Sequence, residues 1–296
     1  MTSEIDITTS NSYIENELLA RLRKLEDVLS GDVITAIVPM FPGVDDIIRS
    51  VVESIDDRSG DLHVVLETSG GSIEVVERIA DLLRHHYSNG EISFIIPNMA
   101  MSAGTVLVMC GDRIMMDYYS VLGPVDPQVR SNTSGTYVPA LGYLHKFNEL
   151  VEKSKAGDLS AAEAAFMIEK FDPAELDQFE KARDLSTDLL EKWLAVYKFK
   201  DWTKTESRGL QVDDDMRKKR AKEIGEKLND TTAWKSHSRG ISMQVLRHNL
   251  NLIIEDFAED ATLNEAIRSY YRLLQDYLHR RGSEAVVQSR EGISLF

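Results

Sequence analysis

Two turns of this sequence carry residues that could together perform hydrolysis. Ser69-Gly70-Gly71 follows the apolar run Val64 to Leu66, and Met101-Ser102-Ala103-Gly104 follows a second apolar run, Ile92 to Ile96. A glycine turn leaves backbone N–H groups uncovered, and such groups can hold a developing oxyanion or a phosphate. A serine among small residues, just before an apolar helix, can present its hydroxyl to a pocket as in a nucleophile elbow, although GxSxG itself is absent.

Each turn also has a simpler interpretation when it is taken alone. The glycine pair could be an ordinary strand-to-helix turn, and the phosphate alternative is disfavoured because GxGxxG and GxxxxGK[ST] are both absent. Ser102 could merely cap the helix that follows it. The two turns together are more specific, because successive strand-to-helix turns place Gly70 and Ser102 side by side at one edge of a sheet.

The segments around the turns predict an α/β fold with a mostly parallel sheet. Strands are expected at Asp32–Met40, Leu62–Glu67, Ile92–Ile96 and Arg113–Met116, and a helix at Ile73–Tyr87. Strands alternating with helices in this way indicate βαβα units, whose sites lie at the carboxyl ends of the strands.

The second half of the chain has the pattern of amphipathic helices. We expect a first domain over residues 1–157, an α/β core with an amino-terminal helix, and a helical extension over residues 158–296. Ser160, with Glu163 three positions on, predicts a capped helix start. Further helices are expected at Met243–Phe257 and Leu263–Leu278, and the tail from Glu284 could hold a short strand or be free. The extension is expected to mediate self-association or to cover the site.

Composition excludes several classes of protein. The chain has 296 residues, 43% of them hydrophobic, and a formal net charge of −15, which argues against nucleic acid and anionic membranes as partners. No apolar run is long enough to span a membrane, and the acidic amino terminus is unlike a secretory signal. The single cysteine, Cys110, cannot form an internal disulfide and is expected to be a core thiol. We therefore expect a cytoplasmic protein.

Three motifs together resemble those of a known group of enzymes. They are Thr68-Ser69-Gly70-Gly71-Ser72, the run Ala100–Thr105, and Leu122-Gly123-Pro124-Val125-Asp126-Pro127-Gln128. On these residues the chain resembles the Clp protease/crotonase fold, within it the signal-peptide-peptidase-A-like serine peptidases, and most closely the serine dehydrogenase proteinase family. The resemblance covers about residues 30–155 and, more weakly, Trp234 to Ile241.

The resemblance implies a ββα-type core and a serine peptidase acting on peptides or unfolded protein segments. Ser102 corresponds to the nucleophile of the family. The oxyanion hole corresponds to the N–H groups of Gly70 or Gly71 and of Ala103, which would stabilise the tetrahedral intermediate of amide cleavage. Members of this fold usually form rings or trimers, so a homo-oligomer is expected.

The residues leave the general base open among three candidates. Clp proteolytic subunits carry a histidine some two dozen residues after the serine, and the run Leu122–Gln128 has none. Related peptidases use a lysine, and Lys146 is the first lysine after Ser102. Lys146 is the predicted base, although a solvated helix lysine is the simpler interpretation, and its pKa would have to fall on burial for that role. The alternatives are His237 and a residue of a neighbouring subunit, while Asp126 is interpreted as a turn residue.

Two other functions on the same fold stay open. A crotonase-type enzyme would use paired N–H groups to hold the enolate of an acyl-coenzyme A thioester, and Ser102 would then be incidental. A non-catalytic oligomeric scaffold would need no base at all. No metal or other cofactor is expected, because His85 and His86 have no partner at metal-ligand spacing and no cysteine cluster exists.

Overall fold

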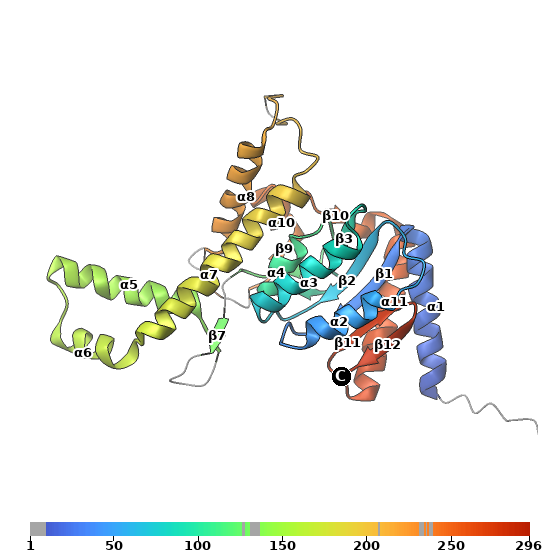
Figure 1. The fold of residues 1–296 in the computed structure, drawn as a ribbon, viewed down its shortest axis with the longest axis horizontal. Coiled ribbons are helices and arrows are strands. Elements are labelled where there is room, and N and C mark those ends of the chain that lie inside the picture. The colour runs from blue at the N-terminus through green and yellow to red at the C-terminus, as the bar shows by residue number, and fades with distance from the viewer. Residues whose placement is uncertain are drawn as a thin grey trace, which may run out of the picture.

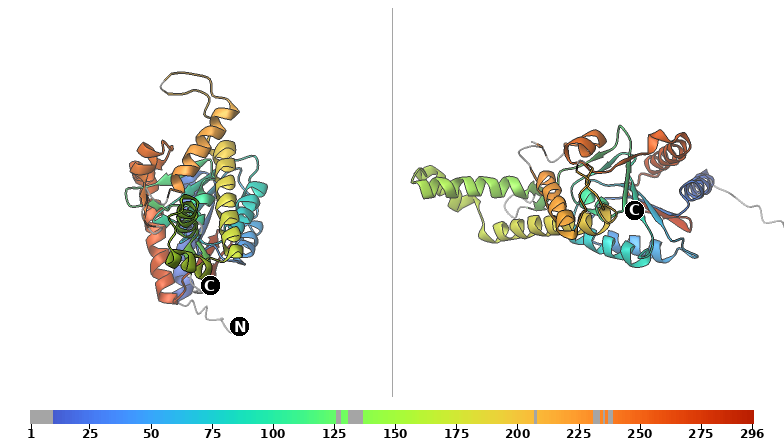
Figure 2. Two further views of the ribbon diagram at one scale, coloured as in Figure 1. Left: turned by 90° about the vertical axis from the view of Figure 1, so that its left-hand side faces the viewer. Right: turned by 90° about the horizontal axis from the view of Figure 1, so that it is seen from above.

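The computed structural model describes residues 10–125, 128–130, 137–206, 208–230, 234, 236 and 239–296, and the side chains of all of these except 128–130 and 137–141. A twisted seven-stranded sheet forms the centre of the molecule, with helices on both faces (Figure 1). An arm of three helices projects from one side of this core (Figure 1, Figure 2).

The central sheet is mixed, with five parallel strands and an antiparallel pair at one edge. Its strand order is β10-β5-β3-β2-β1-β11-β12, and only the pairings of β11 with β1 and with β12 are antiparallel. The strands are β1 (Asp32–Ile37), β2 (Leu62–Glu67), β3 (Ile92–Ile95), β5 (Arg113–Met116), β10 (Glu255–Asp256), β11 (Val286–Ser289) and β12 (Gly292–Leu295). Because β1, β2 and β3 are covered on both faces, nearly all their residues are buried, as parallel strands require.

Two hydrophobic cores lie on opposite faces of the sheet. The larger one packs six helical segments against the sheet, namely α2 (Val44–Glu53), α3 (Ile73–His86), α4 (Ala103–Val108), the end of α7 (Pro173–Trp193), α8 (Asp214–Leu228) and α10 (Met243–Asn249). The other core packs α1 (Ser10–Leu29) and α11 (Ala261–Arg281), together with the 3-10 turn η2 (Phe257–Glu259), against the opposite face. The chain therefore forms a three-layer α/β/α core.

Short paired segments complete the structure. A small sheet joins β4 (Met99–Ala100), β6 (Val121–Leu122) and β9 (Ile241–Ser242), and a hairpin pairs β7 (Gln128–Arg130) with β8 (Tyr137–Pro139). The projecting arm is built from α5 (Ala140–Ala156), α6 (Ala161–Lys170) and α7, and a π-helical turn, η1 (Leu194–Lys198), follows α7.

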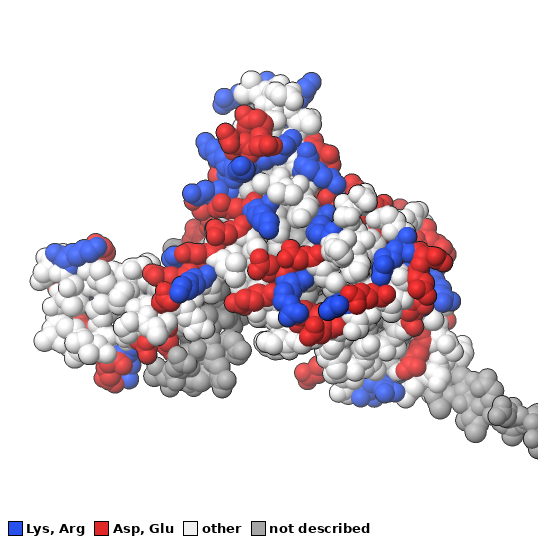
Figure 3. All heavy atoms as spheres, viewed as in Figure 1, with Lys and Arg blue, Asp and Glu red and all other residues white. Residues whose placement is uncertain are grey.

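The arm has a small core of its own and an uncovered apolar side. Leu144 and Phe179 are buried between α5 and α7, and the ring of Phe171 lies 4.7 Å from that of Tyr143. Helix α6 buries none of its residues, and Ile168 on it is 84% exposed. On the face drawn in Figure 3, charged side chains are dense over α2, α3 and α7 and sparser at the α5–α6 end of the arm.

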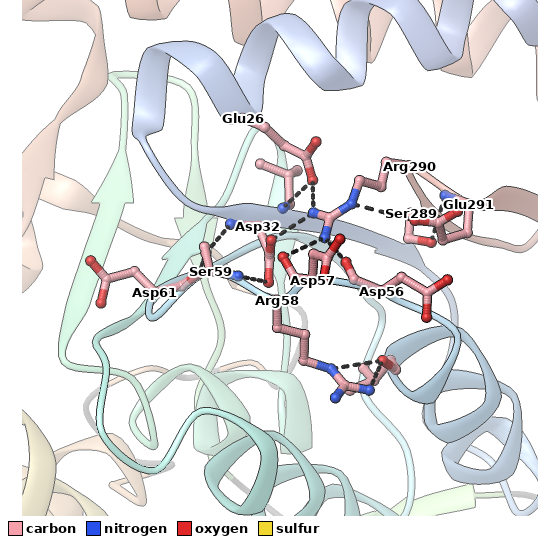
Figure 4. A network of polar contacts seen from close by, with 12 residues as sticks. Glu26, Asp32, Asp56, Asp57, Arg58, Ser59, Asp61, Ser289, Arg290 and Glu291 are labelled. Atoms are coloured by element: carbon pink, nitrogen blue, oxygen red, sulfur yellow. Dashed lines mark hydrogen bonds and ion pairs between the residues drawn. The ribbon is translucent and has the colours of Figure 1, made fainter.

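A buried ionic network attaches the carboxy-terminal hairpin to the amino ends of the strands (Figure 4). Arg290, between β11 and β12, donates from one guanidinium nitrogen to Glu26 at 3.0 Å and to Asp32 at 2.6 Å. The other carboxylate oxygen of Asp32 accepts from the Ser59 N–H and from the Tyr87 hydroxyl. Removing Arg290 would leave Asp32 buried without its cationic partner, which is strongly destabilising, so the network links the hairpin to this end of the sheet.

The α/β fold with a mostly parallel sheet and a helix-rich second half, predicted from the sequence, is confirmed. Segments after residue 157 also return to the core: β10, β11 and β12 belong to the central sheet, and α11 covers one of its faces. The predicted boundary at residue 157 stays a prediction. No helix among the described residues combines the length and the apolar character needed to cross a bilayer.

One predicted helix is wrong in its extent. The expected helix from Met243 to Phe257 ends at Asn249, and residues 255–256 instead form β10 beside β5. Asn251 adopts a left-handed φ of 45°, and the Arg247 guanidinium donates to the Ile254 carbonyl, which holds the chain in a turn. Neither glycine nor proline marks this stop in the sequence, and asparagine tolerates the left-handed conformation.

Candidate active site

The two predicted turns lie side by side because the strands that precede them run in parallel. The Thr68 N–H donates to the Met99 carbonyl, and the Met101 N–H donates to the Thr68 carbonyl, both at 3.0 Å. These bonds continue the pairing beyond the ends of β2 and β3 as an isolated bridge between Thr68 and Ala100. The segments carrying Gly70 and Ser102 therefore leave the same edge of the sheet together.

Gly70 lies directly against Ser102. Its φ is +95°, and a Cβ placed on Gly70 would stand 2.7 Å from the Met101 carbonyl oxygen and 2.8 Å from the Cβ of Ser102. Real Cβ atoms do not approach this closely, so only glycine permits both the turn and the contact. The juxtaposition expected from the sequence is thus present in the structure.

Ser102 has a strained backbone. Its φ is +54° and its ψ is −121°, a conformation that residues other than glycine rarely adopt and that typically costs about 1–3 kcal/mol. The residue is 5% exposed. Its hydroxyl makes no capping hydrogen bond to α4, so the simpler interpretation of Ser102 as a helix cap is wrong. A serine on a sharp, strained strand-to-helix turn is the geometry of a nucleophile elbow.

The backbone N–H groups of the two turns differ in their partners. The Gly70 N–H donates to the Thr68 hydroxyl at 3.0 Å. Within the described part of the chain, neither the Gly71 N–H nor the Ala103 N–H has a hydrogen-bond acceptor. Unpaired backbone N–H groups are the donors that an oxyanion hole needs. The N–H groups of Gly71 and Ala103 are therefore free of acceptors among the described residues, whereas the N–H of Gly70 is occupied.

The third motif supports the serine turn from behind. A Cβ on Gly123 would stand 2.9 Å from the Ser102 nitrogen and 3.0 Å from the Met101 Cα. The Thr105 hydroxyl accepts from the Gly123 N–H at 2.9 Å, and its single proton faces both the Ala100 carbonyl at 2.8 Å and the Gly123 carbonyl at 2.9 Å. The three motifs thus meet at Ser102. Thr105 was included in the second motif, but only the structure shows its bonding role.

Helix α11 holds the ends of β3 and β5 near the site. The Arg268 guanidinium donates to the Pro97 carbonyl at 2.7 Å and forms an ion pair with the buried carboxylate of Asp117. The Asp117 carboxylate also accepts from the N–H and the hydroxyl of Ser120. The Ser120 hydroxyl lies within donating distance of the Ile96 carbonyl as well. Sequence reasoning missed Arg268, because it lies far along the chain in a helix with no motif.

The same helix holds the end of β2. The Glu67 carboxylate accepts from the Tyr271 hydroxyl at 2.5 Å, from the Gln275 amide at 2.8 Å and from the Asn98 amide at 2.6 Å. Burial, and then the bond to Glu67, raises the pKa of Tyr271 well above its ordinary value, so Tyr271 remains a hydrogen-bond donor. Both oxygens of Glu67 are engaged in these bonds, so it is poorly placed to bind a metal ion.

The predicted base Lys146 lies on α5 of the projecting arm. Its side chain is 51% exposed, and its Nζ pairs with Glu149 at 2.9 Å. No hydrogen bond joins Lys146 to Ser102 within the described chain, and the role of Lys146 stays a prediction. The other two residues considered, His237 and Asp126, lie outside the described residues.

Comparison with protein families agrees with the resemblance seen in the motifs. Residues 38–154 match the model of a family described as ClpP-like SDH-type serine proteinase. This segment contains both turns, Ser102 and the third motif, so the resemblance predicted from the motifs is confirmed for this part of the chain.

Two archaeal proteins are similar over part of the chain. Uncharacterized protein MJ0137 of Methanocaldococcus jannaschii is 31% identical over 135 residues, which is 40% of this chain and 46% of the relative. Uncharacterized protein MJ1495 of the same organism is 35% identical over 109 residues, which is 37% of this chain and 34% of the relative. The matched segment thus spans less than half the length of either relative.

Among solved structures, two forms of one protease overlap with part of the molecule. They are mutants of the 1510-N membrane-bound stomatin-specific protease, the second in complex with a substrate peptide. The first has 16% sequence identity and a TM-score of 0.30 over 40% of this chain and 60% of that one. The second has 18% identity and a TM-score of 0.31 over 42% of this chain and 61% of that one.

Proposed function

We propose that this chain, whose residues 38–154 match the ClpP-like SDH-type serine proteinases, is a serine peptidase that hydrolyses peptides or unfolded protein segments. Ser102 is the nucleophile. The N–H groups of Gly71 and Ala103 form the oxyanion hole, and Gly70 gives the turn its close approach to Ser102.

The backbone of Ser102 carries this proposal. A φ of +54° at a serine is unfavourable, and the surrounding contacts to Gly70 and Gly123 maintain it. A non-catalytic scaffold would gain stability from glycine at this position. A crotonase-type reaction needs the paired N–H groups but has no use for a strained serine between them. The strain is explained when the hydroxyl must be presented to a substrate.

The proposed mechanism is that of a serine peptidase. The Ser102 Oγ attacks the carbonyl carbon of a peptide bond, and its proton passes to a general base and then to the leaving amine. The negative charge on the carbonyl oxygen is held by the Gly71 and Ala103 N–H groups, and losing one such donor typically lowers the rate by about 10²–10³. Water then hydrolyses the ester at Ser102 and regenerates the hydroxyl.

Lys146 is the proposed base, acting within an assembly. Because its side chain is half exposed and pairs with Glu149, it must be brought to Ser102 by a movement of α5 or by a second copy of the chain. The uncovered apolar residues of α6, Phe166 and Ile168, support self-association through the arm. Sedimentation that shows only monomers would contradict this assembly, and activity per chain should fall on dilution.

A fluorophosphonate probe tests the function directly. Such probes phosphonylate an activated serine, so the folded protein should be labelled on the peptide that contains Ser102, as located by mass spectrometry. Ser102→Ala should abolish the labelling. Ser50→Ala, which removes an exposed hydroxyl from α2 away from both turns, should leave it intact. A folded protein that resists the probe at every concentration tested would contradict the proposal.

A further inference from the structure

A cavity of about 530 Å³ opens beside the Ser69–Gly70 turn. Its walls come from the end of β1, from the start of α2, from β4 and from the two ends of the carboxy-terminal hairpin. The volume lies within the range of about 300–1,000 Å³ that is usual for sites binding small organic groups.

The walls of the cavity are mostly apolar. Ile37, Val38 and Met99 line it, together with two aromatic residues, Phe41 and Phe296, each of which is 46% exposed. Half-exposed aromatic rings at a cavity provide surface that a ligand can bury. The backbone of Phe296 is held beside that of Ala285: the Phe296 N–H donates to the Ala285 carbonyl and the Ala285 N–H donates to the Phe296 carbonyl, both at 3.2 Å. The fold therefore holds the backbone of Phe296 at the cavity.

The polar residues of the cavity are acidic or neutral. Glu67 and Glu284 line it, and its lining residues, all of which the structure describes, include no lysine, arginine or histidine. An acidic group entering the cavity would meet these two carboxylates without a compensating cation. The cavity is thus complementary to apolar groups and unfavourable for anions.

Both turns of the candidate active site lie next to residues that line the cavity. Ser69, which lines the cavity, directly precedes Gly70, and Met99 stands three positions before Ser102 on the adjacent segment. The Met99 carbonyl accepts the Thr68 N–H, so the two walls are joined by the same bonds that bring the turns together. Ser102 itself does not line the cavity, so we infer that a peptide bound at Ser102 reaches it with a side chain next to the cleaved bond.

We propose that this cavity is a specificity site that receives large apolar side chains of the substrate peptide, from a segment without acidic residues. The inference rests on the proposed peptidase function and names the class of peptide that the site selects. Phe296 and Phe41 form its apolar walls, and Glu284 at its rim rejects acidic residues. The occupant is an extended peptide rather than a free anion or a nucleotide.

Binding to full-length Ser102→Ala protein tests the inference without requiring turnover. The probe is a short fluorescein-labelled Gly-Ser peptide with an adjacent Phe-Leu pair, measured by fluorescence anisotropy. A matched peptide with glycine in place of the pair should bind about tenfold more weakly, since it buries no large apolar side chain. A third peptide, with aspartate on either side of the pair, should also bind more weakly.

Three added substitutions locate the binding. Phe296→Ala should weaken binding of the apolar peptide about threefold to tenfold, because it removes part of the wall. Glu284→Lys should leave that peptide within about twofold but improve binding of the aspartate peptide about threefold. The controls are Ile253→Ala, which truncates an exposed residue next to β10 at the far edge of the sheet, and Glu259→Lys, an exposed residue just after β10. Neither control substitution should change the affinity for any of the three peptides.

The outcomes separate this inference from the proposed function. If Phe296→Ala and Glu284→Lys bind all three peptides as their parent does, the cavity is not the specificity site, whether or not the wild type cleaves peptides. If the predicted binding pattern holds while the wild type hydrolyses none of the unlabelled peptides, the cavity is a peptide site and the peptidase proposal fails.

Discussion

Gly70 and Ser102 lie in direct contact, such that a Cβ on Gly70 would stand 2.8 Å from the Cβ of Ser102. This contact joins the first two motifs of the sequence, which are separated along the chain by a complete helix and strand. It also explains why a residue with no side chain stands at a position whose φ is +95°.

Gly70→Ala should remove activity, because the new methyl group displaces Ser102 from its position. We expect kcat to fall about 100-fold or more, the loss typical of a misplaced catalytic group. Gly43→Ala is the matched control, since Gly43 has a similar φ of +98° but a methyl group added there would meet nothing within 4 Å. Activity and the free energy of unfolding are measured for both variants. Equal losses of activity would show that backbone strain, rather than the contact between residue 70 and Ser102, matters.

Ser102→Gly should be inactive yet more stable than Ser102→Ala. Both variants lose the hydroxyl, but only glycine adopts a φ of +54° without strain, so the difference should be about 1 kcal/mol in the free energy of unfolding. Ser30, an exposed residue with a φ of 58°, offers the control pair Ser30→Gly and Ser30→Ala. That pair should show a similar difference in stability with activity preserved. Urea unfolding of all four variants measures this.

Lys146→Met should lower kcat/KM about 10²-fold or more if Lys146 is the general base. Lys155→Met is a close control, because Lys155 lies on the same helix and pairs with Glu152 as Lys146 pairs with Glu149. Both substitutions remove one exposed charge and one ion pair. Similar activities for the two variants would assign the base to another residue, within the chain or in a neighbouring subunit.

Arg268→Met should destabilise the protein and lower kcat more than it raises KM. It leaves the buried Asp117 without its cationic partner and frees the Pro97 carbonyl, at a cost of about 3 kcal/mol. Without this bond the segment at Pro97 should shift, and this shift should misplace the Ser102 turn, which begins only a few residues later. Arg268→Lys should recover part of the activity. Arg272→Met, an exposed residue one turn along α11, should behave as the wild type.

His63 should make the stability depend on pH in mildly acidic solution. Its pKa is lowered, first by burial and then by the charge of Arg113, against the opposing effects of Asp61 and Asp32. The unfolded chain, in which a histidine has a pKa of about 6.5, therefore binds more protons than the folded chain below that pH. The free energy of unfolding should fall as the pH is lowered below about 6.5.

His63→Leu should flatten this dependence, and His279→Gln, at an exposed position on α11, should retain it. Urea unfolding at a neutral and a mildly acidic pH compares the slopes, which do not depend on the absolute stability of each variant. A slope unchanged by His63→Leu would assign the pH dependence to other groups.

Local sequence pattern predicted the parallel part of the sheet well. The predicted strands Leu62–Glu67 and Arg113–Met116 coincide with β2 and β5, because buried parallel strands read as continuous apolar runs. The antiparallel strand β11 was harder to predict, since its place beside β1 depends on ion pairs of Arg290 with Glu26 and Asp32, which are more than 250 positions away. The early end of α10 at Asn249 depends likewise on a tertiary turn.

The sequence by itself determined which chemistry was available: one serine among small residues and a glycine pair, each after a strand, on a chain able to form a parallel sheet. Only the tertiary structure decided how these groups are used. It showed that Ser102 is strained rather than capping its helix, and that the Gly70 N–H is occupied by Thr68 while those of Gly71 and Ala103 have no acceptor among the described residues. Hydrogen-bond partners and backbone strain depend on contacts between segments distant in the chain, which residue types and spacing do not specify.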